Sequence, residues 1–265
     1  MDRRQFLASG SAAALAAAVP AEALAQMVGY APASEGPGGT RGDAALNAEF
    51  ERIFQQALAR SPELATSLGL DKGANAAWKT QLTARTAERR QSDLATTKAA
   101  LARLDRFEAD TLSAPAKLNM EVIRYSLTAQ TVAPEKFGID SVIRPYRIFQ
   151  QGGAYFQTPD FLNTAHTINS KADADAYLAR LDGFAVALDA DSAVQKAEAA
   201  KGLLAPGWSI DLTLGQMAKL RGQPAASSSI VQSLVKRVAA KGVAGDWQAQ
   251  AAKIVEGKVY PALDR

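Results

Sequence analysis

The chain offers few side chains with which to build a catalytic centre. Its 265 residues include one histidine, His166, and no cysteine. A catalytic zinc ion needs three protein ligands, which are commonly histidine or cysteine. No such site can be assembled here from those two residue types, so we identify no catalytic, cofactor-binding or metal-binding residue. Without cysteine there is also no disulfide bond and no thiolate nucleophile.

Three short stretches imitate functional motifs but lack parts that the chemistry requires. Residues 189–192 begin like a calcium-binding loop, yet the sixth position is not glycine and the twelfth is not acidic. Residues 207–211 lack the second glycine of a nucleophile elbow. Ser233 and Lys236 match a Ser-x-x-Lys pattern without either companion motif. We therefore assign no chemistry to these stretches.

One long segment, residues 134–169, has no helical period and is rich in aromatic side chains. Irregular segments of this kind pack against a scaffold, and ligand contacts concentrate in them. One interpretation is that the segment forms part of a substrate-channel wall with the residues Tyr146, Phe149, Tyr155, Phe156 and His166. The alternative is a connector whose rings fill gaps between helices, with His166 as a hydrogen-bonded structural residue. The sequence leaves both interpretations open.

The overall composition is that of a globular protein, with 48% hydrophobic and 22% charged residues. The net charge is only +3, and basic residues are interspersed with acidic ones. Such a balance is typical of a solvated surface rather than of a nucleic-acid-binding face. We therefore expect no nucleic-acid partner.

The first 25 residues have the three parts of a cleaved export signal. Arg3 and Arg4 precede a small-residue apolar run, 12–19, and a small-x-small cleavage site ends at Ala25. Paired arginines followed by Phe-Leu resemble a twin-arginine signal, whose partner is the Tat translocon. The apolar run is too short to cross a bilayer. We expect a periplasmic mature protein without a stable membrane anchor, beginning with a flexible linker over residues 26–42.

The clearest structural element is a helix expected over residues 170–202. Ser170 and Asp173 form an N-cap pair, and Gly202 followed by Pro206 marks the end. Apolar residues at three- and four-residue steps predict one buried face: Tyr177, Leu178, Leu181, Phe184, Ala185 and Leu188. The charged residues are expected to turn outward: Asp175, Arg180, Asp182, Asp189 and Asp191.

Similar caps and spacings predict an all-α domain of long antiparallel helices over residues 43–265. The first helices are expected from Asp43 and over residues 61–68. Residues 83–112 and 113–134 are expected to form a helical hairpin that Pro134 closes. Its second helix would turn these apolar residues inward: Leu118, Val122, Tyr125 and Ala129. Its first would expose a solvated charged face that includes Arg85, Arg89 and Arg90.

Three further helices are expected in the last quarter of the chain. The first covers residues 210–220, with Leu212, Met217 and Leu220 as its inward positions. The second covers residues 230–240. The third starts after Asp246 and still shows an apolar face near Arg265.

Three features together resemble the N-terminal half of a bacterial family called domain of unknown function 885. They are the export signal, the sequence Ser-Pro-Glu-Leu-Ala-Thr-Ser-Leu-Gly at 61–69, and Tyr-Leu-Ala-Arg-Leu at 177–181 leading to Gly202 and Pro206. The resemblance covers roughly residues 50–265. It implies an all-helical fold, because members look like helical zinc metallopeptidases with an H-E-x-x-P-G-H signature in their C-terminal half. This chain contains no such signature.

Two functions follow from these observations. In the first, the chain is the N-terminal helical portion of an exported zinc-dependent peptidase-like hydrolase with a peptide substrate. Zinc is then expected only in a C-terminal half, and this chain alone is expected to be inactive. In the second, it is a self-contained periplasmic helical binding or interaction protein without catalysis. The apolar residues 259–263 favour the first and predict a reading frame that continues past Arg265, because chain termini are usually polar.

Overall fold

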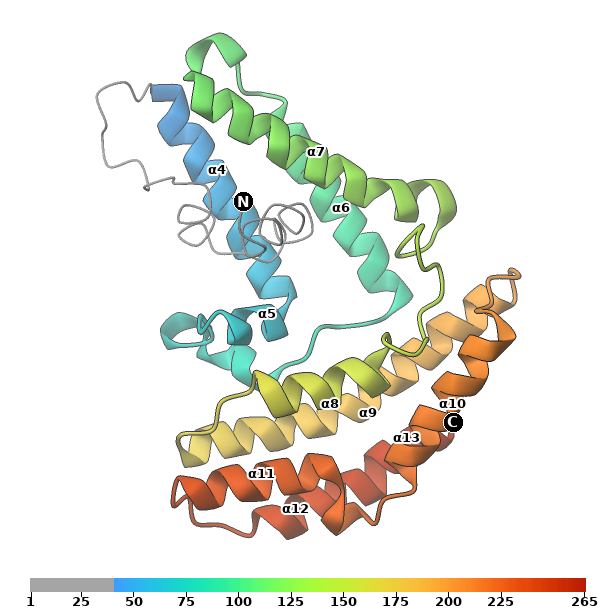
Figure 1. The fold of residues 1–265 in the computed structure, drawn as a ribbon. Helices are drawn as coiled ribbons and strands as arrows, with labels where there is room; N and C mark the ends of the chain where they lie inside the picture. Colours follow the sequence, from blue (N-terminus) through green and yellow to red (C-terminus); the bar gives the residue numbers. More distant parts are fainter. Residues whose placement is uncertain (1–40) are drawn as a thin grey trace, which may run out of the picture. The chain divides into compact units, whose positions relative to one another are not determined.

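The computed structural model describes residues 41–265, so the expected export signal and nearly all of the expected linker lie outside the described residues. Within this range every regular element is a helix and no strand is present, which confirms the predicted all-α fold (Figure 1). The chain forms two compact units. The described part of one comprises residues 41–60 and 91–138, and the other comprises 61–90 and 139–265. We call them the α7 unit and the α9 unit, after their longest helices.

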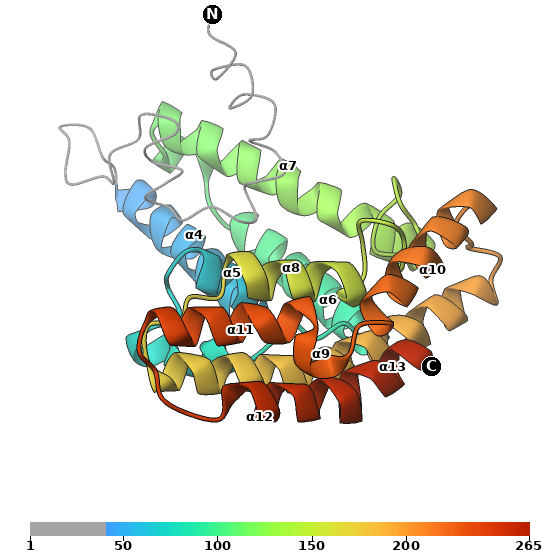
Figure 2. The same cartoon turned by 60° about the horizontal axis from the view of Figure 1, so that its bottom comes forward.

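Helix α9 (Lys171–Ala199) is the central element of the α9 unit. Helices α8, α11 and α12 run alongside it in two views (Figures 1 and 2). The other elements of this unit are α5 (Pro62–Ser67), η1 (Gly73–Thr80), α8 (Ala154–Thr164), α10 (Gly207–Arg221), η3 (Ala225–Ser227), α11 (Ser229–Ala240), α12 (Trp247–Ile254), the π-helical turn η4 (Val255–Val259) and α13 (Tyr260–Asp264).

The start and the apolar face of α9 are as the sequence predicts, and the helix ends at Ala199, three residues before the predicted end at Gly202. The Ser170 hydroxyl accepts a hydrogen bond from the Asp173 amide at 3.2 Å, and all six predicted apolar residues are buried. The expectation for two charged residues is wrong, because Arg180 and Asp191 are only 0% and 1% exposed. Neighbouring elements cover α9 on several sides, so charged side chains also lie inside the unit, where they meet partners from distant parts of the chain.

The last helical stretch runs parallel to α9. Lys258 pairs with Asp182, and Arg265 pairs with Asp189 at 2.7 Å, so both sequences advance in the same direction. Tyr260 is buried, and its hydroxyl donates to the Gln223 carbonyl at 2.5 Å. The apolar end of the chain is therefore packed against this unit. No helix within residues 41–265 is both long and apolar enough to cross a membrane.

The α7 unit is built from α4 (Arg41–Arg60), most of α6 (Ala87–Leu104), η2 (Ala109–Thr111) and α7 (Ala114–Phe137). Ion pairs show the direction of each helix. Arg60 pairs with Asp93 and Glu49 with Arg103, so α4 and α6 are antiparallel. The pairs Lys98–Glu135 and Asp105–Arg124 show that α6 and α7 are antiparallel as well. The core between these helices is formed by Leu46, Ala100, Leu104, Leu112, Ala116, Met120 and Leu127.

Helix α4 begins two residues earlier than predicted. Asp43 lies in its first turn instead of capping it, and the Asp43 carboxylate accepts a hydrogen bond from the Ser113 amide at 2.9 Å. Gly42 approaches Thr111 so closely that a Cβ would lie 2.5 Å from its carbonyl oxygen. The expected linker therefore overlaps the helix at residues 41 and 42, because contacts with η2 and α7 hold them there.

The expected hairpin is present, but its ends and its buried face differ from the prediction. Helix α6 starts only at Ala87, because the Glu63 carboxylate binds the backbone amide of Thr83 at 2.9 Å and holds the preceding residues out of the helix. Helix α7 passes through Pro134 and ends before Gly138, whose φ is +66°. The predicted inward residues Leu118, Val122 and Tyr125 are exposed, and Ala129 is exposed as well. Both faces of α7 carry apolar residues at helical spacings, so periodicity alone does not distinguish them.

This register of α7 predicts opposite effects for two neighbouring apolar residues. Met120 is 6% exposed and Val122 is 52% exposed. Met120→Ala should lower the free energy of unfolding by about 2–5 kcal/mol, because it leaves a cavity in the core. Val122→Ala should change it by about 0.5 kcal/mol or less, because it removes only exposed surface. Urea denaturation of both variants measures the difference, and a larger loss for Val122→Ala would contradict the assigned face.

Candidate functional site

The expectation that residues 134–169 are irregular is wrong in part, because α7 continues to Phe137 and α8 occupies Ala154–Thr164. Residues 139–153 have no helix, and we call them the irregular segment. The α9 unit contains an open cavity of about 750 Å³ between this segment and helix α10, which we call the groove. The segment contributes Ile143, Arg144, Tyr146, Phe149, Gln150 and Gln151. Helix α10 and the residue before it contribute Pro206, Trp208, Ser209, Asp211, Leu212, Gly215, Gln216 and Lys219. A concave site of several hundred Å³ with apolar walls and a few polar groups is typical of small-ligand sites.

A tight turn positions the aromatic wall of the groove. The Gly152 amide donates a hydrogen bond to the Phe149 carbonyl at 2.9 Å. The Phe149 ring lies over Gly152, where a Cβ would come within 2.1 Å of the ring, so only glycine fits. Tyr146 packs edge-on against Phe149, with ring centroids 6.4 Å apart. The Arg144 guanidinium lies 5.1 Å from the Phe149 ring centroid, in cation–π contact.

Helix α10 forms the opposite wall with an unusual distribution of side chains. Its small polar residues Ser209 and Thr213 are buried, whereas four of its large apolar residues are exposed: Trp208, Ile210, Leu212 and Leu214. Leu212 was expected to face inward, but it is 55% exposed and lines the groove. Met217 and Leu220 pack against the core as expected. The prediction failed for Leu212 because α10 meets the core through one narrow face and meets the aromatic segment through polar groups.

Polar contacts behind the groove join its two walls. The Ser209 hydroxyl donates to Gln150 Oε1 at 3.2 Å. The hydroxyl of the buried Tyr155 lies 2.9 Å from the Phe149 carbonyl oxygen and 2.8 Å from Gln216 Oε1. Burial raises the pKa of Tyr155, so its proton stays available for these contacts at neutral pH. Tyr155 therefore supports both walls without lining the groove.

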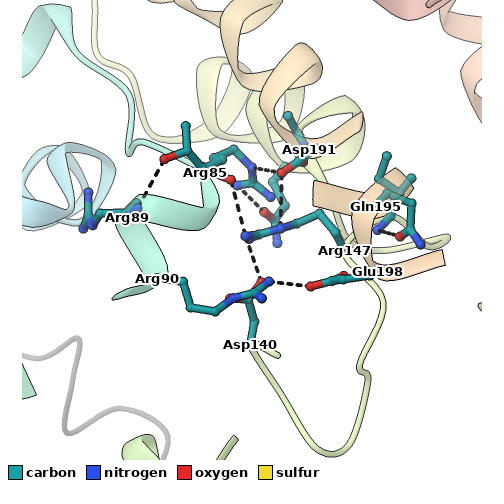
Figure 3. A network of polar contacts seen from close by, with 12 residues as sticks. Arg85, Arg89, Arg90, Asp140, Arg147, Asp191, Gln195 and Glu198 are labelled. Carbon is teal, nitrogen blue, oxygen red and sulfur yellow. Dashed lines mark hydrogen bonds and ion pairs between the residues drawn. The ribbon is translucent and has the colours of Figure 1, made fainter. Parts of the chain in front are cut away.

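A stripe of polar residues on α9 holds the irregular segment from behind (Figure 3). The buried Asp191 carboxylate accepts hydrogen bonds from Arg85 Nε at 2.8 Å and from the Ala154 amide at 2.6 Å. It thereby provides a hydrogen-bond acceptor for a backbone amide at the N-terminus of α8 that has no partner within the helix. The preceding residue, Gly153, adopts a φ of +95°. Arg147 Nε lies 3.6 Å from the same carboxylate. One buried acid thus fixes the end of the segment and two arginines.

The stripe continues along the same face of α9 at Gln195 and Glu198. Gln195 Oε1 accepts a hydrogen bond from the Ile148 amide at 3.0 Å. Glu198 pairs with Arg90 at 2.5 Å, and Arg90 also pairs with Asp140 at 2.6 Å. Asp140 in turn pairs with Arg147 at 2.9 Å, as Figure 3 shows. Three arginines and three acids therefore balance their charges behind the groove.

This network corrects the expectation of a solvated charged face. Arg85 and Arg90 are largely buried ion-pair partners instead. Sequence reasoning also missed Asp191, Gln195 and Glu198, although their four- and three-residue spacing places them on one helical face. That spacing is the one feature of the sequence that indicates a shared polar face. Their partners lie 37 to 108 residues away, so the sequence does not indicate which groups they meet.

His166 lies away from the groove, in a buried cluster around Arg180. The imidazole Nδ1 accepts from Arg180 at 2.8 Å, and Nε2 donates to the Asp173 carbonyl at 2.9 Å. Arg180 also donates to Thr66 Oγ1 at 2.6 Å and to the Gln81 carbonyl at 2.9 Å. Burial lowers the pKa of His166 from 6.5 to about 4, and the charge of Arg180 acts in the same direction. His166 is therefore neutral at pH 7.

The structure brings together some of the five residues expected at a channel wall. Tyr146 and Phe149 line the groove, and Tyr155 supports it. Phe156 lies on α8, partly exposed, and His166 belongs to the Arg180 cluster; neither lines the groove. Residues 41–265 contain no group of three or more His, Cys, Asp or Glu side chains that could hold a metal. No chemical step through zinc is therefore assigned to these residues.

Comparison with known proteins gives the family. A model of the family described as "Bacterial protein of unknown function (DUF885)" matches residues 62–265. This chain belongs to that family. The match includes the whole groove and the α9 stripe, so both lie within the DUF885 region. No curated protein is significantly similar to the chain in sequence.

A solved structure shares the fold. The crystal structure of "the putative lipoprotein from Colwellia psychrerythraea" is similar to this DUF885 chain with a TM-score of 0.76 and 16% sequence identity. The similarity covers 84% of this chain and 40% of that chain. This chain therefore spans less than half the length of that relative. At 16% sequence identity, the similarity shows a shared fold and nothing further.

The His166 cluster predicts a pH-dependent stability. Because the folded-state pKa of about 4 lies below the ordinary value of 6.5, the unfolded chain binds a proton first as the pH falls. The contribution of His166 to the free energy of unfolding is therefore fully present above about pH 7, and it is lost progressively as the pH falls toward 4. Lowering the pH from 7.5 to 5 should cost about 2 kcal/mol of unfolding free energy. His166→Gln, which keeps one donor and one acceptor, should remove most of this dependence in urea denaturation. An identical pH dependence in both proteins would contradict the assignment.

Proposed function

We propose that this chain is the peptide-binding helical portion of an exported zinc-dependent peptidase-like hydrolase, and that the groove holds the peptide substrate. The observation that carries the proposal is the groove itself. It combines exposed apolar side chains from α10 with an ordered aromatic wall, and peptides present both apolar side chains and backbone polar groups. Gln150, Gln151 and Gln216 supply donors and acceptors for such a backbone.

The family context supports the catalytic part of the proposal. The resemblance to helical zinc metallopeptidases implies zinc ligands in a C-terminal half, and the matched region is only 40% of the Colwellia psychrerythraea chain. In this proposal, residues 41–265 supply substrate contacts, while the zinc ion and its general base belong to residues outside this range. The paired arginines at the N-terminus support export through the Tat translocon to the periplasm.

A second function is favoured by the completeness of the groove. Both walls and the network behind them are formed by residues within 85–90 and 140–219, inside one compact unit. A self-contained periplasmic binding protein would use the groove in the same way, without catalysis. The two functions differ in hydrolysis and not in peptide binding by this chain.

Peptide binding is tested with a variant that fills the groove without disturbing the fold. Gly215 lines the groove on α10, and a Cβ at this position would meet nothing within 4 Å. Gly215→Leu should weaken binding at least tenfold while stability stays equal or rises, because glycine disfavours helices by about 0.5–1 kcal/mol. Ala218→Leu, on the same helix but outside the groove lining, is the matched control.

The measurement is a calorimetric titration of the 265-residue chain with an alanine–leucine–alanine tripeptide whose two ends are free. Saturable binding that Gly215→Leu removes and Ala218→Leu retains is the expected result. Absence of binding to the unaltered chain, or equal binding by both variants, would overturn the proposal. Co-expression with any coding sequence that follows Arg265, in the presence of zinc, then separates the functions: hydrolysis supports the peptidase, and binding without hydrolysis supports the binding protein.

A further inference from the structure

The groove carries three charged side chains that no oppositely charged residue within 41–265 neutralises, although Arg144 also lies against the Phe149 ring. Arg144 and Lys219 are cationic, and Asp211 is anionic; all three are exposed and line the groove. None of them forms an ion pair with another residue in the described range 41–265. The arginines directly behind the aromatic wall, Arg90 and Arg147, are by contrast both engaged in ion pairs. The groove charges are therefore available to a ligand.

The spacing of Asp211 and Lys219 along α10 determines the length of peptide that can span both charges. Asp211 and Lys219 are eight residues apart, which corresponds to about 12 Å along a helix. Gly215 lies midway and has no side chain, so the helix backbone is open between the two charges. An extended peptide advances about 3.3–3.6 Å per residue. A peptide of three or four residues therefore fits between the acidic and the basic position.

We propose that the groove recognises short peptides by their free ends, with the terminal amine at Asp211 and the terminal carboxylate at Lys219 and Arg144. Trp208 and Leu212 lie beside Gly215 on the same side of α10 and contact an apolar side chain of the peptide. This proposal rests on the proposed function and specifies its substrate class. The groove thus selects short zwitterionic peptides over internal segments of long chains.

Charge complementarity favours this occupant over a simple anion. A carboxylate is a good partner for a guanidinium and an ammonium, because charge-assisted hydrogen bonds are stronger than neutral ones. A phosphate or a polyanion would satisfy the two cations but would be repelled by Asp211. A zwitterion satisfies all three groups. The terminal amine also gives Asp211 a partner that no described residue provides.

The test compares four forms of one alanine–leucine–alanine tripeptide: unmodified, amidated at the C-terminus, acetylated at the N-terminus, and blocked at both ends. Calorimetric titration of the 265-residue chain gives the dissociation constant of each. The unmodified form should bind at least tenfold more tightly than the amide and several-fold more tightly than the acetylated form. Lys219→Gln should reduce the acid-to-amide preference to below threefold. Lys236→Gln, an exposed lysine outside the groove with the same change of charge, should preserve it.

Each outcome bears on the proposal separately from peptide binding itself. If Asp211→Asn removes the preference for a free amine while the preference for a free carboxylate remains, the assigned polarity is supported. If all four forms bind equally, end recognition is overturned while the peptide groove stands. If neither Lys219→Gln nor Arg144→Gln changes the acid-to-amide ratio, the assigned carboxylate site is overturned. If no form binds, both this proposal and the proposed function are overturned.

Discussion

The buried carboxylate of Asp191 is the constraint on which the groove depends. An ionised acid that is 1% exposed is tolerated only if cations and hydrogen-bond donors compensate for its lost hydration. Arg85 supplies a charge, and the Ala154 amide supplies a backbone donor at the start of α8. The same contacts that satisfy Asp191 therefore fix the end of the aromatic segment. Gln195 repeats the arrangement one helical turn later at Ile148, so the segment follows the surface of α9 without regular secondary structure of its own.

The segment is held from behind, and α10 contacts it through the polar side chain of Ser209 and contacts the adjacent Tyr155 through Gln216. Trp208 and Leu212 of α10 therefore stay exposed in the groove. Burying those side chains would have favoured folding by about 1.5–3 kcal/mol each. Trp208 is instead 64% exposed at the groove. Exposed apolar side chains such as Trp208 and Leu212 that lie in a groove beside ordered aromatic rings are typical of an interaction site. These apolar side chains of α10 do not pack in the core of the unit. They form an exposed surface in the groove that a ligand can cover.

The sequence predicts those features that depend on local rules. The cap at Ser170 and the breakers after it define α9, because capping and chain reversal involve neighbouring residues. The sequence also identifies Tyr146 and Phe149 as candidates, because an aromatic-rich segment without a period must pack against something. It does not predict that Arg180 and Asp191 are buried, since hydropathy assigns both to the surface and their partners are remote in sequence. It does not choose between the two apolar faces of α7, and it places His166 near a site from which the fold separates it. The sequence also does not predict that α10 lines the groove. Leu212 continues a helical apolar pattern, and such a pattern predicts burial.

The central claim is that Asp191 positions the aromatic wall, and hydrogen exchange of the Asp191→Asn variant tests it most directly. Asp189→Asn is the control, because Asp189 lies on the same helix and pairs with Arg265 at the surface. Breaking a buried ion pair costs about 3–5 kcal/mol, so part of that loss should appear as local opening of the segment. We predict that backbone amides between residues 146 and 156 exchange at least tenfold faster in Asp191→Asn, while those of α11 and those in the control are unchanged. Unchanged exchange of the segment in a folded Asp191→Asn protein would contradict the account.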